Sequence, residues 1–103
     1  MDLVDEVYLL MKLLPKDELF ALSSQIRRAV VSIPSNIAEG YERKSKKEYV
    51  HFLSVAKSSR AELETQLLIC IRQKFFTQEQ ADKAFGLSKE VGRMLNAIIN
   101  KNT

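Results

Sequence analysis

One pair of residues in the sequence has the spacing of a metal site. Glu48 and His51 form a Glu-x-x-His unit, which puts both side chains on one face of a helix, as in helical bundles that hold two iron ions. Such sites need two of these units plus two further carboxylates, and His51 is the only histidine in the chain. A symmetric oligomer could pool His51 from several subunits, but Glu48 also fits a helix-capping role. We therefore predict no metal and no cofactor.

Positive charge is concentrated in the middle third of the chain. Residues 24–60 carry eight Lys or Arg against three Glu, whereas residues 1–23 carry two Lys against five acids. A basic surface attracts phosphate groups, although many solvated turns have a similar composition. The candidate nucleic-acid contacts are Arg27, Arg28, Arg43, Lys44, Lys46, Lys47 and Lys57.

The other reactive side chains fit structural roles better than catalytic ones. Cys70 is the only cysteine and lies in an apolar run, as a buried thiol does. Glu62 and Glu64 could act as paired acids, but they fit ion pairs with arginines better. Asn36 follows Pro34 by two residues, so that its amide could bond backbone groups freed by the proline or, alternatively, act as a polar ligand in the core. We expect no enzymatic activity.

The elements that must position these residues are helices. The chain of 103 residues is 46% hydrophobic, with only three Gly and two Pro, which favours helix. Short connections between helices predict an all-α, antiparallel, up-down-up-down four-helix bundle in a single domain over residues 1–103. The periodicity of apolar residues predicts helices over residues 2–14, 16–42, 45–75 and 78–100.

Two capping motifs and one internal proline refine this prediction. Ser45-Lys46-Lys47-Glu48 and Thr77-Gln78-Glu79-Gln80 match the capping box that begins a helix. Pro34 lies inside the helix predicted over 16–42, where it removes the hydrogen bond to the Val30 carbonyl. Because the apolar stripe resumes at Ile37, we expect a bend in one continuous helix and not a break.

The apolar surface of the last two predicted helices is wider than one bundle core requires, which favours self-association. The apolar residues beside their main stripes are Val50, Val55, Leu68, Ile69, Phe76, Phe85, Leu87, Met94 and Ile99. No apolar run approaches the roughly 20 residues that cross a bilayer, and the acidic start does not fit a signal peptide. We expect a soluble, cytoplasmic protein with no membrane contact.

Several segments resemble a known family of bacterial four-helix bundles, associated with intervening sequences of 23S ribosomal RNA genes and related to the accessory variability protein of diversity-generating retroelements. The segments are Gln25-Ile26-Arg27-Arg28-Ala29, Ser32-Ile33-Pro34-Ser35-Asn36-Ile37-Ala38-Glu39-Gly40, Arg43, Glu48, Phe52-Leu53 and Glu62-Leu63-Glu64-Thr65-Gln66-Leu67. The resemblance implies a ring-like homopentamer that associates with nucleic acid, has no enzymatic activity, and could have a protein partner such as a reverse transcriptase. Family members usually begin the first helix a few turns earlier, which implies a truncated helix or an alternative start. They also commonly have Gly where this chain has Ser58.

Together, the residues and the resemblance predict a non-enzymatic homo-oligomer that binds RNA or DNA through backbone phosphates. The alternative is a protein-interaction scaffold whose basic surface meets an acidic partner.

Overall fold

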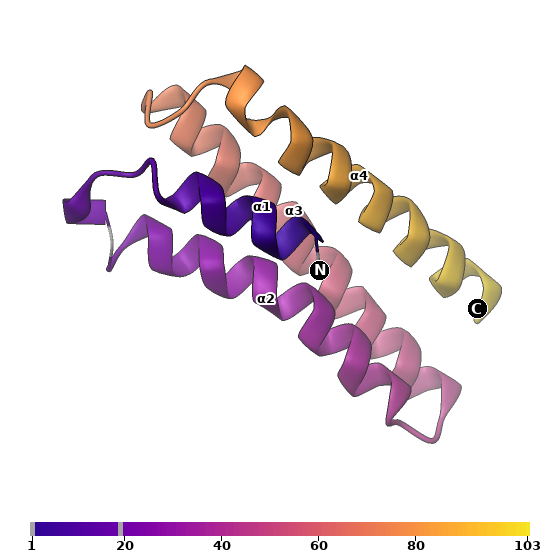
Figure 1. Ribbon diagram of the computed structural model, residues 1–103. Helices are drawn as coiled ribbons and strands as arrows, with labels where there is room; N and C mark the ends of the chain where they lie inside the picture. The colour runs from indigo at the N-terminus through magenta and orange to yellow at the C-terminus, as the bar shows by residue number, and fades with distance from the viewer. Residues whose placement is uncertain (1, 19) are drawn as a thin grey trace.

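The computed structural model describes residues 2–18 and 20–103, and every regular element within them is helical (Figure 1). Helix α1 packs against α2 and α4, and α3 packs against the same two helices from the other side. The chain therefore forms the four-helix bundle that the sequence predicts. The elements in chain order are α1 (Asp2–Met11), the 3-10 helix η1 (Lys16–Glu18), α2 (Leu22–Tyr41), α3 (Lys46–Arg72) and α4 (Gln78–Lys101).

The first helix ends at Met11, three residues before the predicted end of the helix over 2–14. The N–H of Leu13 bonds the Leu10 carbonyl at 2.9 Å, a tighter turn that ends the α-helix. Pro15 adds to this, because it disfavours the helical conformation for the residue before it.

The second helix begins at Leu22, so the predicted start at residue 16 was wrong. The acidic segment after Pro15 forms one short 3-10 turn, in which the Glu18 N–H bonds the Pro15 carbonyl at 3.0 Å. Leu19, which was part of the predicted apolar stripe, lies outside the described residues.

The third helix ends at Arg72 and does not reach residue 75 as predicted. Lys74 has a φ of 66°, in the left-handed region. The Phe75 N–H bonds the Cys70 carbonyl at 3.0 Å, and the Lys74 N–H bonds the Ile71 carbonyl at 2.9 Å. These two bonds make a Schellman motif, which usually has glycine at the left-handed position. Lysine in its place concealed the helix end from sequence analysis.

Of the two predicted capping boxes, the one at α4 is complete, whereas at α3 only the Ser45 half is formed and the Glu48 carboxylate does not return a bond to the Ser45 N–H. The Ser45 hydroxyl accepts a bond from the Glu48 N–H at 3.1 Å. At α4 the box is complete: the Thr77 hydroxyl accepts from the Gln80 N–H at 3.1 Å, and the Gln80 side-chain oxygen accepts from the Thr77 N–H at 2.9 Å. The capping motifs therefore placed the starts of α3 and α4 correctly.

Helix α2 continues through Pro34 without interruption, as predicted. The amide of Asn36 donates to the Ser32 carbonyl at 2.8 Å and to the Ser32 hydroxyl at 2.9 Å. The Asn36 amide therefore bonds the turn beside the proline. It does not bond the Val30 carbonyl, which lacks its usual helical partner because Pro34 has no N–H. The Ser32 hydroxyl also lies 2.9 Å from the Ser59 hydroxyl, which joins α2 to α3. The predicted bend stays a prediction.

One apolar core fills the bundle, and it includes several of the side chains that were predicted to form a second apolar face. Phe76 is buried, and Phe85, Leu87 and Ile99 are half-buried and pack against the core. Of the nine residues proposed as a second apolar face, Leu68, Ile69 and Met94 are exposed. No helix of the described residues is long and apolar enough to cross a membrane.

Candidate nucleic-acid interface

Two of the seven predicted basic residues lie together in the first half of α2. The core-facing side of α2 holds Ile26 and Ala29, so Arg27 and Arg28 between them are turned away from the core. They line an open hollow of about 500 Å³ with Tyr8, Ser24, Val31, Ser32 and Ser35. None of the described residues that line this hollow is acidic. We call it the α2 hollow.

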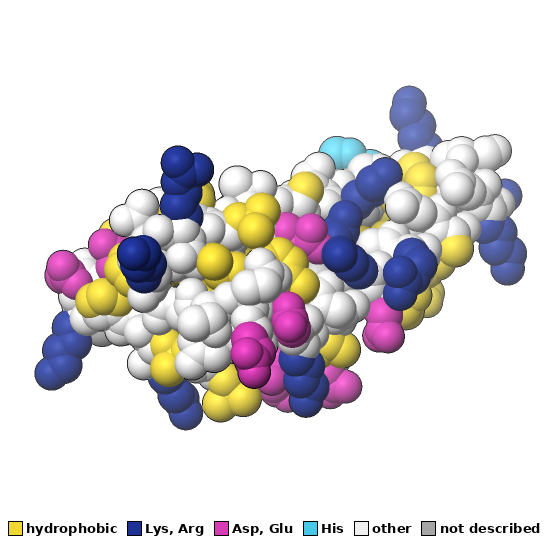
Figure 2. All heavy atoms as spheres, turned by 90° about the horizontal axis from the view of Figure 1, so that it is seen from above, with side chains coloured by type: hydrophobic (Ala, Val, Ile, Leu, Met, Phe, Trp, Pro, Cys, Tyr) yellow, Lys and Arg dark blue, Asp and Glu magenta, His cyan; other side chains and the backbone are white. Residues whose placement is uncertain are grey.

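A second basic group lies at the turn between α2 and α3. A smaller hollow of about 230 Å³, the turn hollow, is lined there by Gly40, Tyr41, Arg43, Lys44, Ser45, Lys46 and Tyr49. Lys47 is exposed beside it. Figure 2 shows mainly Lys and Arg among the charged side chains at the end where this turn lies in Figure 1. The structure thus brings four of the predicted residues to one end of the bundle.

The Arg43 side chain has two partners within the bundle. Its guanidinium forms an ion pair with Glu39 one turn earlier, and its central carbon lies 4.9 Å from the centroid of the Phe52 ring. A cation over an aromatic face is attracted by the ring electrons. Arg43 is therefore held in place at the edge of the turn hollow.

Carboxylates reduce the charge of the turn. Glu39, Glu42 and Glu48 lie in the same segment as its four cations, so residues 39–48 have a net charge of only +1. The α2 hollow has two arginines and no acidic residue in its described lining, but Arg28 also lines a neighbouring hollow with Glu62 of α3.

The two groups are separate in space. Arg28 and Arg43 are 15 residues apart, mostly along α2, which corresponds to about 20 Å. This exceeds the Debye length of about 8 Å at physiological salt, so the two groups act independently on a bound anion. Lys57 is exposed on α3 and lines neither hollow. A nucleic acid would have to extend over about six phosphates of one strand to reach both the α2 hollow and the turn hollow.

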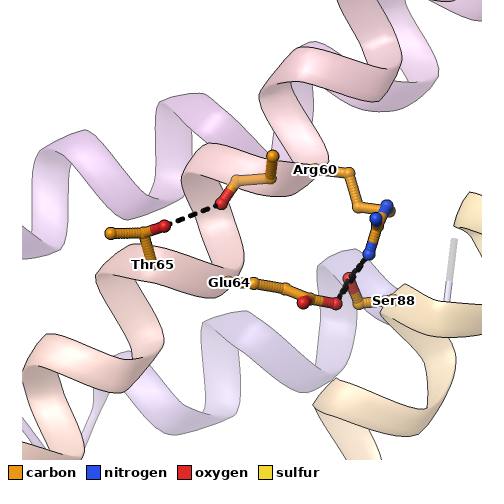
Figure 3. A network of polar contacts seen from close by, with 5 residues as sticks. Arg60, Glu64, Thr65 and Ser88 are labelled. Atoms are coloured by element: carbon orange, nitrogen blue, oxygen red, sulfur yellow. Dashed lines mark hydrogen bonds and ion pairs between the residues drawn. The ribbon is translucent and has the colours of Figure 1, made fainter.

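The ion pair with an arginine that the sequence favours for Glu64 is present. Its partner is Arg60, one turn earlier on α3, and the structure extends the pair into a network between α3 and α4 (Figure 3). The Arg60 guanidinium donates to the Glu64 carboxylate at 2.7 Å, and the Ser88 hydroxyl donates to the same oxygen at 2.7 Å. Arg60 also lies 3.4 Å from the Ser88 hydroxyl. Glu62 accepts a separate bond from Gln66 at 3.3 Å. The two glutamates therefore serve different partners and do not form a catalytic pair.

Sequence analysis missed the contribution of Gly92 to this network. The arginine side chain crosses α4 at Gly92, where an added Cβ would lie 2.7 Å from the Arg60 Nε atom. The available signal was a glycine on the buried face of α4, which permits close approach of a neighbouring group.

The remaining reactive groups show no catalytic arrangement. His51 is exposed, with its ring edge-on to Phe52 at 5.5 Å. Nowhere in residues 2–18 and 20–103 do three His, Cys, Asp or Glu gather to hold a metal. Burial and, secondarily, the charge of Glu18 raise the pKa of the Cys70 thiol to about 11, so that it stays protonated and unreactive near neutral pH. Burial, together with the neighbouring Tyr41, raises the pKa of Tyr49.

These observations define a class: a four-helix bundle with basic hollows on its surface and no evident catalytic arrangement among the described residues. The chain belongs to the 23S rRNA-intervening sequence protein family, whose model matches residues 1–97. It is similar to a crystal structure of a protein of unknown function from the S23 ribosomal protein family of Bacteroides thetaiotaomicron, with a TM-score of 0.86 and 29% identity over 95% of this chain and 92% of that chain. Among curated proteins, the comparison found no match. Neither of the two matching descriptions names an enzymatic activity, and the kinship with the retroelement accessory protein stays a prediction.

Proposed function

We propose that this protein is a non-enzymatic homo-oligomer that binds RNA or DNA through backbone phosphates. The observation that carries the proposal is the α2 hollow, where two arginines and several serine hydroxyl groups meet in a lining with no described acidic residue. The description of its family, which names a 23S rRNA-intervening sequence, supports RNA as the ligand.

The chemistry of the α2 hollow suits a phosphate group. Arginine presents a planar fork of N–H donors that matches phosphate oxygens. Arg28 is exposed, and the hydroxyls of Ser24 and Ser35 on the same helix can donate further bonds. Such contacts position a phosphate backbone but carry no base information, so binding should depend weakly on sequence.

The turn hollow supplies a second contact. Arg43 is already oriented by Glu39 and Phe52, so binding a phosphate there costs little side-chain entropy. Helix α3 begins at Lys46, and the helix dipole favours negative charge at this N-terminal end. Lys44 and Lys47 add exposed cations.

Self-association would multiply these contacts. On the family resemblance we propose a homopentamer, in which symmetry repeats both hollows around a ring and builds a continuous track for phosphates. A protein partner such as a reverse transcriptase is proposed on the resemblance alone.

Nucleic-acid titrations test the proposal. Two variants remove charge, one with Arg27 and Arg28 changed to Gln, the other with the turn cations Arg43, Lys44, Lys46 and Lys47 changed to Gln. Fluorescence anisotropy with unrelated labelled single-stranded RNA and DNA should show weaker binding of all sequences alike. The slope of log affinity against log salt should fall by about 0.7 for each phosphate that the variant no longer neutralises. A control variant removes four exposed lysines outside both hollows: Lys12, Lys16, Lys83 and Lys89.

Three results would count against phosphate binding at these hollows. They are full affinity in both hollow variants, an equal loss in the control variant, and a strong sequence preference at high salt. If the wild type binds no nucleic acid but binds an acidic protein through the same residues, the chain is the protein-interaction scaffold instead.

A further inference from the structure

An apolar groove lies between α2 and α4 beside the start of α1. Helix α1 has 10 residues and α4 has 24, which correspond to about 15 and 36 Å. Beside the first residues of α1, no described helix covers α2 and α4 on the side opposite α3 (Figure 1). The groove holds about 250 Å³, and its lining includes Val4, Pro34, Ile37, Tyr41, Met94 and Ile98.

One end of the groove opens onto positive charge. Tyr41 lines both the groove and the turn hollow, so the apolar trough leads directly to Arg43, Lys44 and Lys46. Drug-sized ligands usually occupy about 300 to 1,000 Å³, so a trough this small suits a few inserted side chains better. Its occupant should have apolar side chains next to a carboxylate.

The outer face of α1 and the turn after it have this pattern. Asp5 and Leu9 on α1 and Leu13 in the turn are spaced by four residues, and Leu9 and Leu13 are 56% and 45% exposed. Asp5 precedes Leu9 by about one turn, or about 6 Å. In the groove, Pro34 and Tyr41 lie seven residues apart on α2, or about 10 Å. Two leucines can therefore fill the trough while the carboxylate approaches the turn hollow.

The other exposed apolar pair has no exposed carboxylate one turn before it. Leu68 and Ile69 on α3 are 53% and 42% exposed, but the acid four residues before Leu68 is Glu64, which is half-buried and bonded by Arg60 and Ser88. Asp5, four residues before Leu9, is exposed. An available carboxylate next to exposed leucine therefore selects α1.

We propose that the groove of one subunit receives the outer face of α1 from a second copy of this chain, with Leu9 and Leu13 in the trough and Asp5 near Lys44. This inference rests on the proposed self-association and names the two surfaces that meet. Because the two surfaces differ, the contact is head-to-tail, and repetition closes a ring when the rotation between subunits permits it.

Mixing of two interface variants tests the pairing. Leu9→Asp damages only the α1 face, and Met94→Asp damages only the groove, at a side chain that is 62% exposed. Analytical ultracentrifugation should show that each variant alone assembles at least about 30-fold more weakly, as expected for a central interface residue. An equimolar mixture should form heterodimers, since the intact groove of one variant can receive the intact α1 of the other. Leu68→Asp is the matched control and should assemble as the wild type does.

Other outcomes would overturn the pairing. They are a monomeric wild type, undiminished assembly of either variant, a mixture that forms no heterodimer, and assembly lost only in Leu68→Asp. If a variant unfolds, Leu9→Cys mixed with Met94→Cys must give a disulfide-linked heterodimer in preference to homodimers. If assembly survives both aspartates and laurate raises the Tm of the wild type but not of Met94→Asp, the groove belongs to a small anionic amphiphile. None of these variants changes the seven basic residues, so the nucleic-acid titrations stand or fall separately.

Discussion

Gly86 and Gly92 lie on the same helix, α4, and replacing each with alanine should have opposite effects on stability. An added Cβ at Gly86 meets no atom within 4 Å, whereas at Gly92 it would lie 2.7 Å from Nε and 2.8 Å from Cζ of Arg60. Both contacts are closer than van der Waals distance, so the guanidinium must move. We therefore predict that Gly92→Ala displaces the Arg60 guanidinium and weakens its bonds with Glu64 and Ser88, and that Gly86→Ala leaves these bonds unchanged.

The balance of two terms gives the sign and the size of each effect. Alanine is favoured over glycine inside a helix by about 0.8–1.0 kcal/mol, so Gly86→Ala should raise the free energy of unfolding by about that amount. The Arg60 and Glu64 side chains are only 21% and 24% exposed, and hydrogen bonds to charged groups are worth about 1.5–3 kcal/mol. For Gly92→Ala, a loss of about 2 kcal/mol from the Arg60 network exceeds the gain of about 1 kcal/mol from replacing glycine in the helix. This variant should therefore destabilise the protein by about 1 kcal/mol. The two variants should thus differ by about 2 kcal/mol.

Thermal unfolding followed by circular dichroism measures this difference. For a domain of this size, 1 kcal/mol shifts Tm by about 4–8 °C, so the two variants should differ in Tm on the order of 10 °C. A double-mutant cycle identifies the cause, because in an Arg60→Met background the network is already absent. There, Gly92→Ala should stabilise about as much as Gly86→Ala.

Two results would refute the reasoning. Equal changes in Tm for the two glycine variants would mean that Arg60 does not depend on Gly92. A loss of stability from Gly92→Ala that persists in the Arg60→Met background would mean that the backbone, and not the arginine, fills the space beside Gly92.

Two further predictions concern stability. Lys74 has a left-handed backbone, a conformation that costs an L-residue about 1–2 kcal/mol and costs glycine little. Glycine loses more chain entropy on folding, which offsets part of this difference. Lys74→Gly should therefore raise the free energy of unfolding in urea by roughly 0.5–1 kcal/mol, and Lys74→Ala should not raise it. Burial raises the pKa of the Cys70 thiol to about 11 in the folded state. The buried neutral thiol therefore contributes fully to stability below the pKa of the unfolded state, and this stability is lost as pH rises through the pKa of the folded state. The free energy of unfolding should fall by about 1.4 kcal/mol per pH unit between about pH 9 and 11. Cys70→Ala should lack that decrease, and parallel pH profiles of the wild type and this variant would contradict the assignment.

The sequence predicted the helices best where side chains act locally. The caps at Ser45 and Thr77 were correct because a hydroxyl bonds the backbone within its own turn. The start of α2 was not, because Pro15 and the acids after it fit a helical first turn but formed a 3-10 turn. The end of α3 was also missed, since Lys74 adopts a conformation that its residue type does not announce.

The candidate site was predicted in composition but not in arrangement. All seven basic residues were named from charge, yet charge did not show that five of them line two separate hollows and that Lys47 and Lys57 line neither. Tyr8 reaches the α2 hollow from α1, a contact between helices that no local pattern encodes. The apolar groove was also invisible, because the wide apolar surface of the sequence gave no indication of which side chains the core would leave uncovered.

The packing of α2 places the two arginines of the proposed anion site on a fixed helix. The inward face of the helix is occupied by buried apolar residues, which are Ile26, Ala29, Val30 and Ile33. Arg27 and Arg28 therefore lie outside the core. The Ser32 hydroxyl joins the helix to Ser59 on α3, which fixes the floor of the hollow relative to its neighbour. A site on a fixed helix loses less conformational entropy on binding than one on a loop. We therefore expect Arg27 and Arg28 to bind phosphate with little ordering of the backbone, as Arg43 should bind it with little ordering of a side chain that Glu39 and Phe52 already orient.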